Sequence, residues 1–475
     1  MFRRCISRLT TSPIAPVIGS EALGTEVSVA SAFRSVQQVW NMDFKDMPVT
    51  TSTLSFRGSE DSSAPIFHIL DLDGKIAKPS DFSGGESSTE LMVSPNGDAL
   101  YRPLAEDESS IISRDVAERM MTSMIAHNTM DKIMLEAQRQ GRISFYMSMF
   151  GEESAVIGAA AGLASNDELF MQYRESGLLT YRGYTIPQFV AQCMGNSECD
   201  LKGRQMPIHY GSVKLHAQVV SSPLATQIPH GAGAGYAFRL ENAALLKQAP
   251  PGTDIAAMPD ARICATFFGE GASSEGDFHA GLNFAATMGS HTLFFVRNNG
   301  YAISTPTHSQ YVGDGVLGRA IGYGMPSARI DGQDAVAVYY TVRKAREMIL
   351  RTNKPVFIEA MTYRVSHHST SDDSTAYRTK DEIGHFADLF SPIERFEKFL
   401  LERNWWNSEK SAEIMEKTRK ELLSELRRQE SIPPWPVSTL CDDVYEVMPE
   451  DLKKQQKELT EHYQRFKDKY DQEKL

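Results

Sequence analysis

The chain has 475 residues and a formal net charge of −12, so it can bury a large core and does not favour a nucleic-acid partner. No run of about 18 apolar residues occurs, and the sequence therefore predicts no membrane span. Five cysteines over this length do not form the dense pattern of a disulfide framework.

The amino-terminal segment has the composition of a targeting peptide. It carries Arg3, Arg4 and Arg8 with several Ser and Thr residues, and its first acidic residue is Glu21. This pattern is typical of mitochondrial transit peptides, with a disordered tail as the alternative. We expect residues 1–45 to be a transit peptide and lead, and residues 46–110 to be an extension without catalytic residues.

Helical patterns follow on both sides of the central region. A long helix is expected from about Ser113 to Gln140, and the small residues Gly158 to Gly162 predict a helix packed tightly against a sheet. Residues 392–475 are charged and helical in pattern, with two helices expected at about 408–429 and 449–470. We interpret this last part as a C-terminal helical segment.

Residues 261–305 predict a strand, a glycine turn, a helix, a second strand and a polar turn. The apolar run Ile263 to Phe268 ends at Gly269-Glu270-Gly271, where small residues let backbone N–H groups approach an anion. A second apolar run, Thr292 to Val296, ends in Arg297-Asn298-Asn299. Both polar clusters are therefore expected at the carboxyl ends of neighbouring parallel strands, where open α/β sheets bind ligands.

Two side chains of these clusters offer hard oxygen ligands, Glu270 and Asn299. With a backbone carbonyl just after Asn299, two diphosphate oxygens and a water, they would complete the six-coordinate shell of Mg²⁺. The alternative interpretation of this glycine turn is a dinucleotide-binding fingerprint, G-x-G-x-x-G. The spacing does not match that fingerprint, because the next glycine after Gly271 is Gly276.

The Gly-Glu-Gly turn followed one helix and one strand later by Asn-Asn resembles the thiamine diphosphate motif. The run GEGASSEGD, with Glu at the acidic position, resembles the α subunit of the E1 component of the branched-chain 2-oxo acid dehydrogenase complex. The resemblance covers roughly residues 60–475 and implies a three-layer αβα thiamine-diphosphate-binding fold, with a mostly parallel sheet, over residues 111–391. It is weakest over residues 79–110.

The resemblance also assigns roles to individual residues. The implied cofactor-binding residues are Tyr173, Arg174, Ser222, Leu224, Gly269, Glu270, Gly271, Ala272, Arg297, Asn299, Tyr301, Ala302, Ile303, Arg364 and His368. His368 is also the implied catalytic residue, and Glu270, Asn299 and the Tyr301 carbonyl are the implied Mg²⁺ ligands. The implied K⁺ ligands are Ser221, Pro223, Thr226 and Gln227. On residues alone, the segment around Tyr173 also fits a solvated loop. Within the resemblance, Glu175 is expected to hold Arg174.

Ser369 follows His368 directly and matches the regulatory phosphorylation site of the family, which implies a kinase and a phosphatase as partners. A phosphoryl group there would add negative charge beside an anionic cofactor and repel it. The second family site falls on Thr379, where the usual residue is Ser.

Thiamine chemistry also needs a carboxylate that activates the aminopyrimidine, and no motif in this chain presents one. The resemblance therefore implies a separate E1 β subunit that supplies this Glu, in an α₂β₂ heterotetramer that docks on a lipoyl-bearing E2 acyltransferase. The implied location is the mitochondrial matrix.

The implied activity is that of a 3-methyl-2-oxobutanoate dehydrogenase (2-methylpropanoyl-transferring), in the catabolism of valine, leucine and isoleucine. A pyruvate dehydrogenase E1 α subunit is the first alternative, but its family usually has GDGAANQG-like and HGHSMSDP-like segments where this chain has GEGASSEG and SHHSTSDDS. A non-catalytic structural paralogue is the second alternative. The intact Glu270, Arg297, Asn299 and His368 argue against it.

Overall fold

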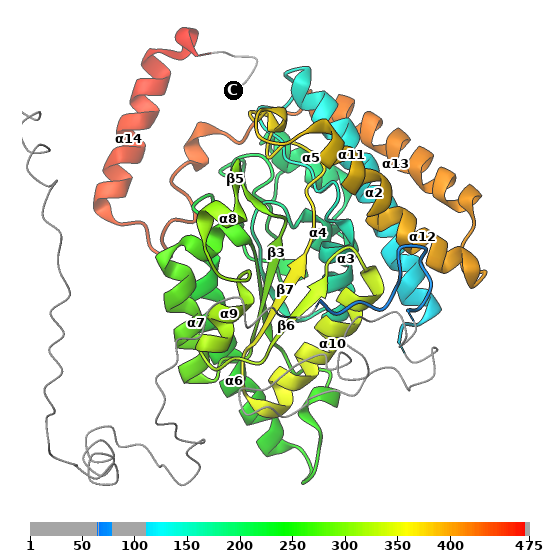
Figure 1. Cartoon of the computed structure of the whole chain (residues 1–475). Coiled ribbons are helices and arrows are strands. Elements are labelled where there is room, and N and C mark those ends of the chain that lie inside the picture. The colour runs from blue at the N-terminus through cyan, green and yellow to red at the C-terminus, as the bar shows by residue number, and fades with distance from the viewer. Residues whose placement is uncertain (1–63, 65, 78–110, 471–475) are drawn as a thin grey trace, which may run out of the picture. The chain divides into compact units, whose positions relative to one another are not determined.

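The computed structural model describes residues 64, 66–77 and 111–470, all within the compact unit Ser59–Leu475 (Figure 1). The expectations for the transit peptide and for most of the extension at 46–110 fall on residues outside this part. No helix in the described part is long and apolar enough to cross a membrane.

The fold is built on a five-stranded sheet in which every neighbouring pair is parallel. Its order is β1 (Glu168–Phe170), β2 (Cys264–Gly269), β3 (Thr292–Asn298), β7 (Val356–Met361) and β6 (Ser327–Asp331). The register pairs Gly269 with Arg297, so the glycine turn and the Arg-Asn-Asn cluster lie side by side as the sequence predicted. A two-stranded hairpin, β4 (Tyr301–Ala302) and β5 (Thr305–Pro306), follows this cluster.

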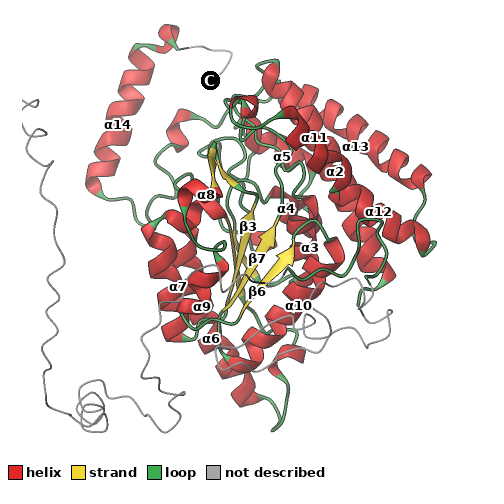
Figure 2. Cartoon of the chain, in the orientation of Figure 1, coloured by secondary structure: helices red, strands yellow, loops and turns green. Residues whose placement is uncertain are grey.

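Helices cover both faces of the sheet and form the outer layers of an αβα sandwich (Figure 2). On one face α3 (Glu153–Gly162) and α10 (Ala335–Thr352) pack over Phe267 and Phe295, with α2 (Arg114–Arg139) behind them. On the other face α6 (Gln227–Gln248), α7 (Gly276–Met288) and α9 (Leu317–Gly322) pack over Phe268 and Phe294. Burial on both faces explains the nearly continuous apolar runs of the central strands.

Glycines set how closely these layers approach. A Cβ added to Gly231 of α6 would lie 1.9 Å from Thr266 Oγ1 of β2, so only glycine allows this helix to lie so near the sheet. The small residues of α3 act differently from the prediction, because a Cβ at Gly158 would meet Val338 Cβ of α10 at 2.9 Å. The helix lies over the sheet as expected, but its glycines allow a close approach to the neighbouring helix α10 rather than to the strands.

The long helix predicted from Ser113 to Gln140 is confirmed as α2, and Ser113 caps it by accepting a hydrogen bond from the Val116 N–H. Two short helices, α4 (Ser176–Arg182) and α5 (Ile186–Met194), lead from the sheet to the loops before α6. The turn α8 (Thr307–Gln310) follows the hairpin, and α11 (Lys380–Leu389) and α12 (Pro392–Glu402) follow β7. The two predicted C-terminal helices are observed as α13 (Ser408–Gln429) and α14 (Glu450–Arg465).

Candidate thiamine diphosphate site

A cavity of about 130 Å³ lies where the loops after β1, β2, β3 and β7 meet. Its lining contains Gln172 and 14 of the 15 residues assigned to the cofactor from sequence, all except Ser222. The strand ends bring these side chains together because parallel strands present their carboxyl ends at one edge of the sheet.

Glu270 stands in a 3₁₀ turn directly after β2 and is 1% exposed. Burial raises the pKa of its carboxyl group to about 7, and its Oε1 has no hydrogen-bond partner in the described chain. A buried carboxylate oxygen without a partner is costly, and a bound cation would satisfy it. Glu270 therefore fits a metal ligand.

Asn299 lies beside this carboxylate and is also buried. Its Oδ1 accepts a hydrogen bond of 3.2 Å from the Tyr301 N–H, and its Nδ2 donates to Glu152 Oε1 at 3.3 Å. No group of three or more His, Cys, Asp or Glu side chains that could hold a metal exists among the described residues. A cation at Glu270 would therefore draw on amide, backbone and ligand oxygens, which suits Mg²⁺.

Arg297 projects from the end of β3 and is bound by two buried carboxylates. Its Nη1 donates to Glu152 Oε1 at 2.7 Å and its Nε donates to Glu175 Oε1 at 2.8 Å. These charges raise the pKa of Arg297 above its ordinary value, although burial acts in the opposite direction. The interpretation that Glu175 holds Arg174 is therefore wrong, because Glu175 pairs with Arg297 instead.

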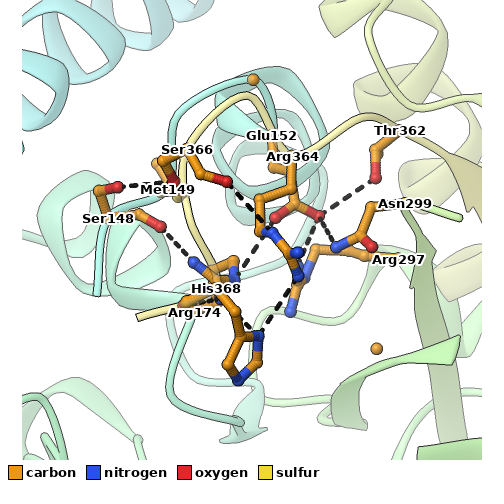
Figure 3. A network of polar contacts seen from close by, with 12 residues as sticks. Ser148, Met149, Glu152, Arg174, Arg297, Asn299, Thr362, Arg364, Ser366 and His368 are labelled. Carbon is orange, nitrogen blue, oxygen red and sulfur yellow. Dashed lines mark hydrogen bonds and ion pairs between the residues drawn. The ribbon is translucent and has the colours of Figure 1, made fainter. Parts of the chain in front are cut away.

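Two other guanidinium groups keep more of their charge for a ligand. Arg174 donates to the carbonyls of Ser148 at 2.5 Å and His368 at 2.6 Å (Figure 3). Arg364 donates to the Ile303 carbonyl at 2.9 Å and has no carboxylate among its hydrogen-bond partners in the described chain. Arg174 has one carboxylate nearby, because Glu152 Oε2 lies 3.6 Å from its Nε. In the described chain both arginines keep guanidinium donors that form no hydrogen bond with a carboxylate, and such donors are well suited to diphosphate oxygens.

His368 lies between these two arginines. Burial, together with the charges of Arg174 and Arg364, lowers its pKa to about 3, so the ring is neutral at physiological pH. The guanidinium nitrogens of Arg364 and Arg174 lie 3.3 and 3.4 Å from Nδ1 and can only donate. Nδ1 is then the acceptor, and the single ring proton is on Nε2.

The rim of the cavity is apolar and partly open. Leu224 is 37% exposed and Ile303 is 50% exposed, and both line the cavity. Ile303 adopts a φ of +57°, which is costly for a β-branched side chain. Such a conformation is typical of ligand clamps.

The remaining predicted residues lie outside the cavity lining. Ser222 is exposed and forms a hydrogen bond of 2.8 Å with His209 Nε2. Of the residues assigned to K⁺, Thr226 donates a hydrogen bond through Oγ1 to the Pro223 carbonyl oxygen at 3.3 Å. Two of the expected K⁺ ligands therefore lie side by side. Gln227 is buried and donates to the Phe267 carbonyl.

The two candidate phosphorylation sites occupy different settings. Ser369 is half-buried, and its Oγ accepts a hydrogen bond of 3.2 Å from the Ser371 N–H. Thr379 is the N-cap of α11 and accepts a hydrogen bond of 3.1 Å from the Glu382 N–H.

Sequence reasoning missed two residues that shape the site. Gln172 accepts a hydrogen bond of 2.9 Å from the Gly269 N–H and so holds the glycine turn. Glu152 is fully buried and contacts Arg297 and Asn299. The available signal was the pair of acidic residues at 152 and 153, set in an otherwise apolar, glycine-rich stretch.

Comparisons with known proteins agree with this geometry. A family model described as "Dehydrogenase E1 component" matches residues 121–437, a range that contains the whole cavity. Proteins named "2-oxoisovalerate dehydrogenase subunit alpha, mitochondrial" are 42% identical over 409 residues in Homo sapiens, covering 86% of this chain and 82% of the relative. In Caenorhabditis elegans the identity is 41% over 426 residues, covering 90% and 94%. An Arabidopsis thaliana protein named as subunit alpha 1 is 43% identical over 406 residues, covering 83% and 82%.

Proposed function

Because the chain belongs to the dehydrogenase E1 component family, and within it to the α subunits of mitochondrial 2-oxoisovalerate dehydrogenase, we propose that it is the α subunit of the decarboxylase for branched-chain 2-oxo acids. Family membership makes the enzyme dependent on thiamine diphosphate and implies a β subunit and an E2 component. The names of the relatives confirm the mitochondrial location expected from the basic amino terminus. The reaction is oxidative decarboxylation, with transfer of the acyl group to the lipoyl group of E2.

The unpaired, buried Oε1 of Glu270 carries the proposal, because it fits a cation between this chain and a diphosphate. Glu270, Asn299 and the Tyr301 carbonyl would hold Mg²⁺, while Arg174 and Arg364 would hold the diphosphate. When bound, thiamine diphosphate supplies the electron sink for the loss of CO₂ from a 2-oxo acid. His368 would donate its Nε2 proton in a hydrogen bond without changing charge near neutral pH.

The acidic residues of the cavity support a shared active site. Of the described residues that line it, Glu270 is the one carboxylate. If Glu270 binds the metal, no carboxylate is left to activate the aminopyrimidine, and a Glu of the β subunit would supply it. The expected assembly is an α₂β₂ heterotetramer in the mitochondrial matrix, which passes the acyl group to a lipoyl-bearing E2.

Two further proposals concern regulation and a second cation. A K⁺ ion bound by oxygens of Ser221, Pro223, Thr226 and Gln227 would steady the loop that carries Leu224. A kinase and a phosphatase would act on Ser369, which stands next to His368 in a loop at the cavity.

Substrate choice is tested by co-expressing the chain with its β subunit and comparing 3-methyl-2-oxobutanoate with pyruvate. We expect kcat/KM for the branched substrate to exceed that for pyruvate by at least about tenfold, since each buried CH₂ contributes about 0.8 kcal/mol. A preference for pyruvate would instead identify a pyruvate dehydrogenase α subunit. No turnover of either substrate in the assembled complex would favour a non-catalytic paralogue.

A further inference from the structure

Glu152 is a buried carboxylate that connects the ends of several strands. It immediately precedes α3, and its Oε1 accepts hydrogen bonds from Arg297 Nη1 at 2.7 Å, Thr362 Oγ1 at 3.1 Å and Asn299 Nδ2 at 3.3 Å. Its Oε2 lies 3.6 Å from Arg174 Nε. Figure 3 shows this carboxylate in the middle of the network. Glu152 does not line the cavity itself, so it acts on a ligand through the residues that do.

The contact with Asn299 fixes which way the amide points. A carboxylate can only accept hydrogen bonds, so the NH₂ group of Asn299 must face Glu152. Oδ1 then points away from Glu152 and accepts the Tyr301 N–H at 3.2 Å, with a second lone pair left for a cation. With a neutral amide at position 152, this orientation would no longer be imposed.

Glu152 also balances charge among the arginines. Among the described residues it is the one acidic side chain within ion-pair distance of Arg174, whereas Arg297 is additionally paired with Glu175. Loss of its charge would leave Arg174 with only neutral partners among the described residues, the Ser148 and His368 carbonyls and His368 Nδ1, and would weaken one of the two anchors of Arg297.

The backbone around Glu152 is held from several sides. Asp131 Oδ2 accepts a hydrogen bond of 2.7 Å from the Met149 N–H, and Glu153 Oε2 accepts one of 2.9 Å from the Gly151 N–H. Gly151 has a φ of +88°, and a Cβ there would lie 2.2 Å from the Tyr363 carbonyl oxygen. Residues 146–152, which we name the Glu152 corner, therefore present the carboxylate in a fixed place.

We propose that Glu152 is a positioning residue that turns the oxygen of Asn299 toward the metal and holds Arg174 and Arg297 around it. This inference rests on the proposed Mg²⁺ site at Glu270 and Asn299. Residues that orient metal ligands in this way change metal affinity by about 10- to 100-fold when they are replaced.

The first test is Glu152→Gln in the assembled complex with the β subunit. Calorimetric titration with Mg²⁺ at saturating thiamine diphosphate measures the apparent Kd for the metal. We expect this Kd to be at least about tenfold higher in the variant than in the wild type. At saturating Mg²⁺, kcat should fall much less. An unchanged Mg²⁺ affinity would overturn the proposal.

Glu153→Gln is the matched control. Glu153 is also buried and directly follows the Glu152 corner, but its partners are Asn128 and Gly151 rather than Asn299. We expect this variant to lower the melting temperature yet to keep Mg²⁺ affinity near that of the wild type. Equal losses of affinity in both variants would mean that Glu152 only maintains the fold.

A double-variant comparison tests whether Glu152 acts through Asn299. Asn299→Ala removes the proposed ligand oxygen, so Glu152→Gln should weaken Mg²⁺ binding less in the Asn299→Ala background than in the wild type. Equal losses of affinity in the two backgrounds would contradict the orienting role. Glu270→Ala distinguishes failure of the proposed metal site from failure of the role of Glu152. If both Glu270→Ala and Glu152→Gln leave Mg²⁺ binding intact, the proposed metal site is wrong. If Glu270→Ala abolishes Mg²⁺ binding while Glu152→Gln has no effect, only the proposed role of Glu152 is wrong.

Discussion

Ser369 and His368 are adjacent residues that differ in whether they can become charged near neutral pH. His368 stays neutral because burial and two arginines hold its pKa near 3. A phosphoryl group on Ser369 would instead bring between about one and a half and two negative charges into the loop whose His368 contacts Arg174 and Arg364. Phosphorylation of Ser369 would therefore change the charge of this loop, whereas a change of pH near neutrality leaves His368 uncharged.

Ser369→Glu should abolish decarboxylation in the assembled complex while the fold stays intact. The added carboxylate competes with the cofactor for Arg174 and Arg364. The measurement is turnover of 3-methyl-2-oxobutanoate together with the melting temperature.

Ser371→Glu serves as its control, because Ser371 is exposed in the same loop, whereas Ser369 is half-buried and adjoins His368. This variant should retain at least about half of the turnover, since an exposed charge is screened by solvent and salt. Near-normal turnover in Ser369→Glu would contradict the regulatory role.

The position of a residue in the site was easier to predict from the sequence than the partners with which it interacts. The glycine turn, Asn299 and His368 lie together as expected because strand ends determine where they go. The partner of Arg297 was not predictable, because Glu175 and Glu152 are 122 and 145 residues away along the chain. Contacts of this kind depend on the packing of separate elements and leave no local pattern.

At the scale of elements, the Glu152 corner depends on buried acids supplied by helices. Asp131 of α2 is 1% exposed and accepts hydrogen bonds from the Tyr146 hydroxyl and the Met149 N–H, each at 2.7 Å. Burial nevertheless raises its pKa to about 7. The corner is therefore held by a carboxyl group of α2 that is costly to ionise.

The stability of the Asp131→Asn variant relative to the wild type should increase as pH rises. An unfolded Asp titrates near about 3.9, so between this pH and about 7 the folded wild type binds more protons than the unfolded chain and loses stability with rising pH. The variant has no carboxyl group at this position, so its free energy of unfolding lacks this pH-dependent contribution. Its free energy of unfolding relative to the wild type should rise by about 1.4 kcal/mol per pH unit within that window. Denaturation of both proteins at pH 5, 6 and 7 measures this difference, and parallel pH profiles would contradict the assignment.

Element prediction succeeded where local signals were strong. The helix α2 has a Ser cap and an apolar stripe, and the buried strands β2 and β3 have apolar runs that end in polar turns. The strands β1 and β6 carried no such signal, since β1 spans three residues and β6 includes Arg329. Arg329 is buried only because Asp314 and Glu359 pair with it.

At the scale of the whole molecule, we expect the chain to supply one half of a shared active site. The sheet gathers the residues proposed to bind the metal and the diphosphate at one edge, but the cavity lining has a single carboxylate among the described residues. Its apolar rim at Leu224 and Ile303 stays partly exposed. Both features fit a site that is completed by the β subunit implied by the family.

The most direct measurement is turnover of 3-methyl-2-oxobutanoate, with Mg²⁺ and thiamine diphosphate, by the α subunit alone, the β subunit alone and their mixture. We expect activity only in the mixture, and a loss of at least about a hundredfold when Glu270→Ala replaces the wild-type α subunit, since removal of a metal ligand costs several kcal/mol. Turnover by the α subunit alone, or full activity of Glu270→Ala at limiting Mg²⁺, would contradict a shared site built on Glu270.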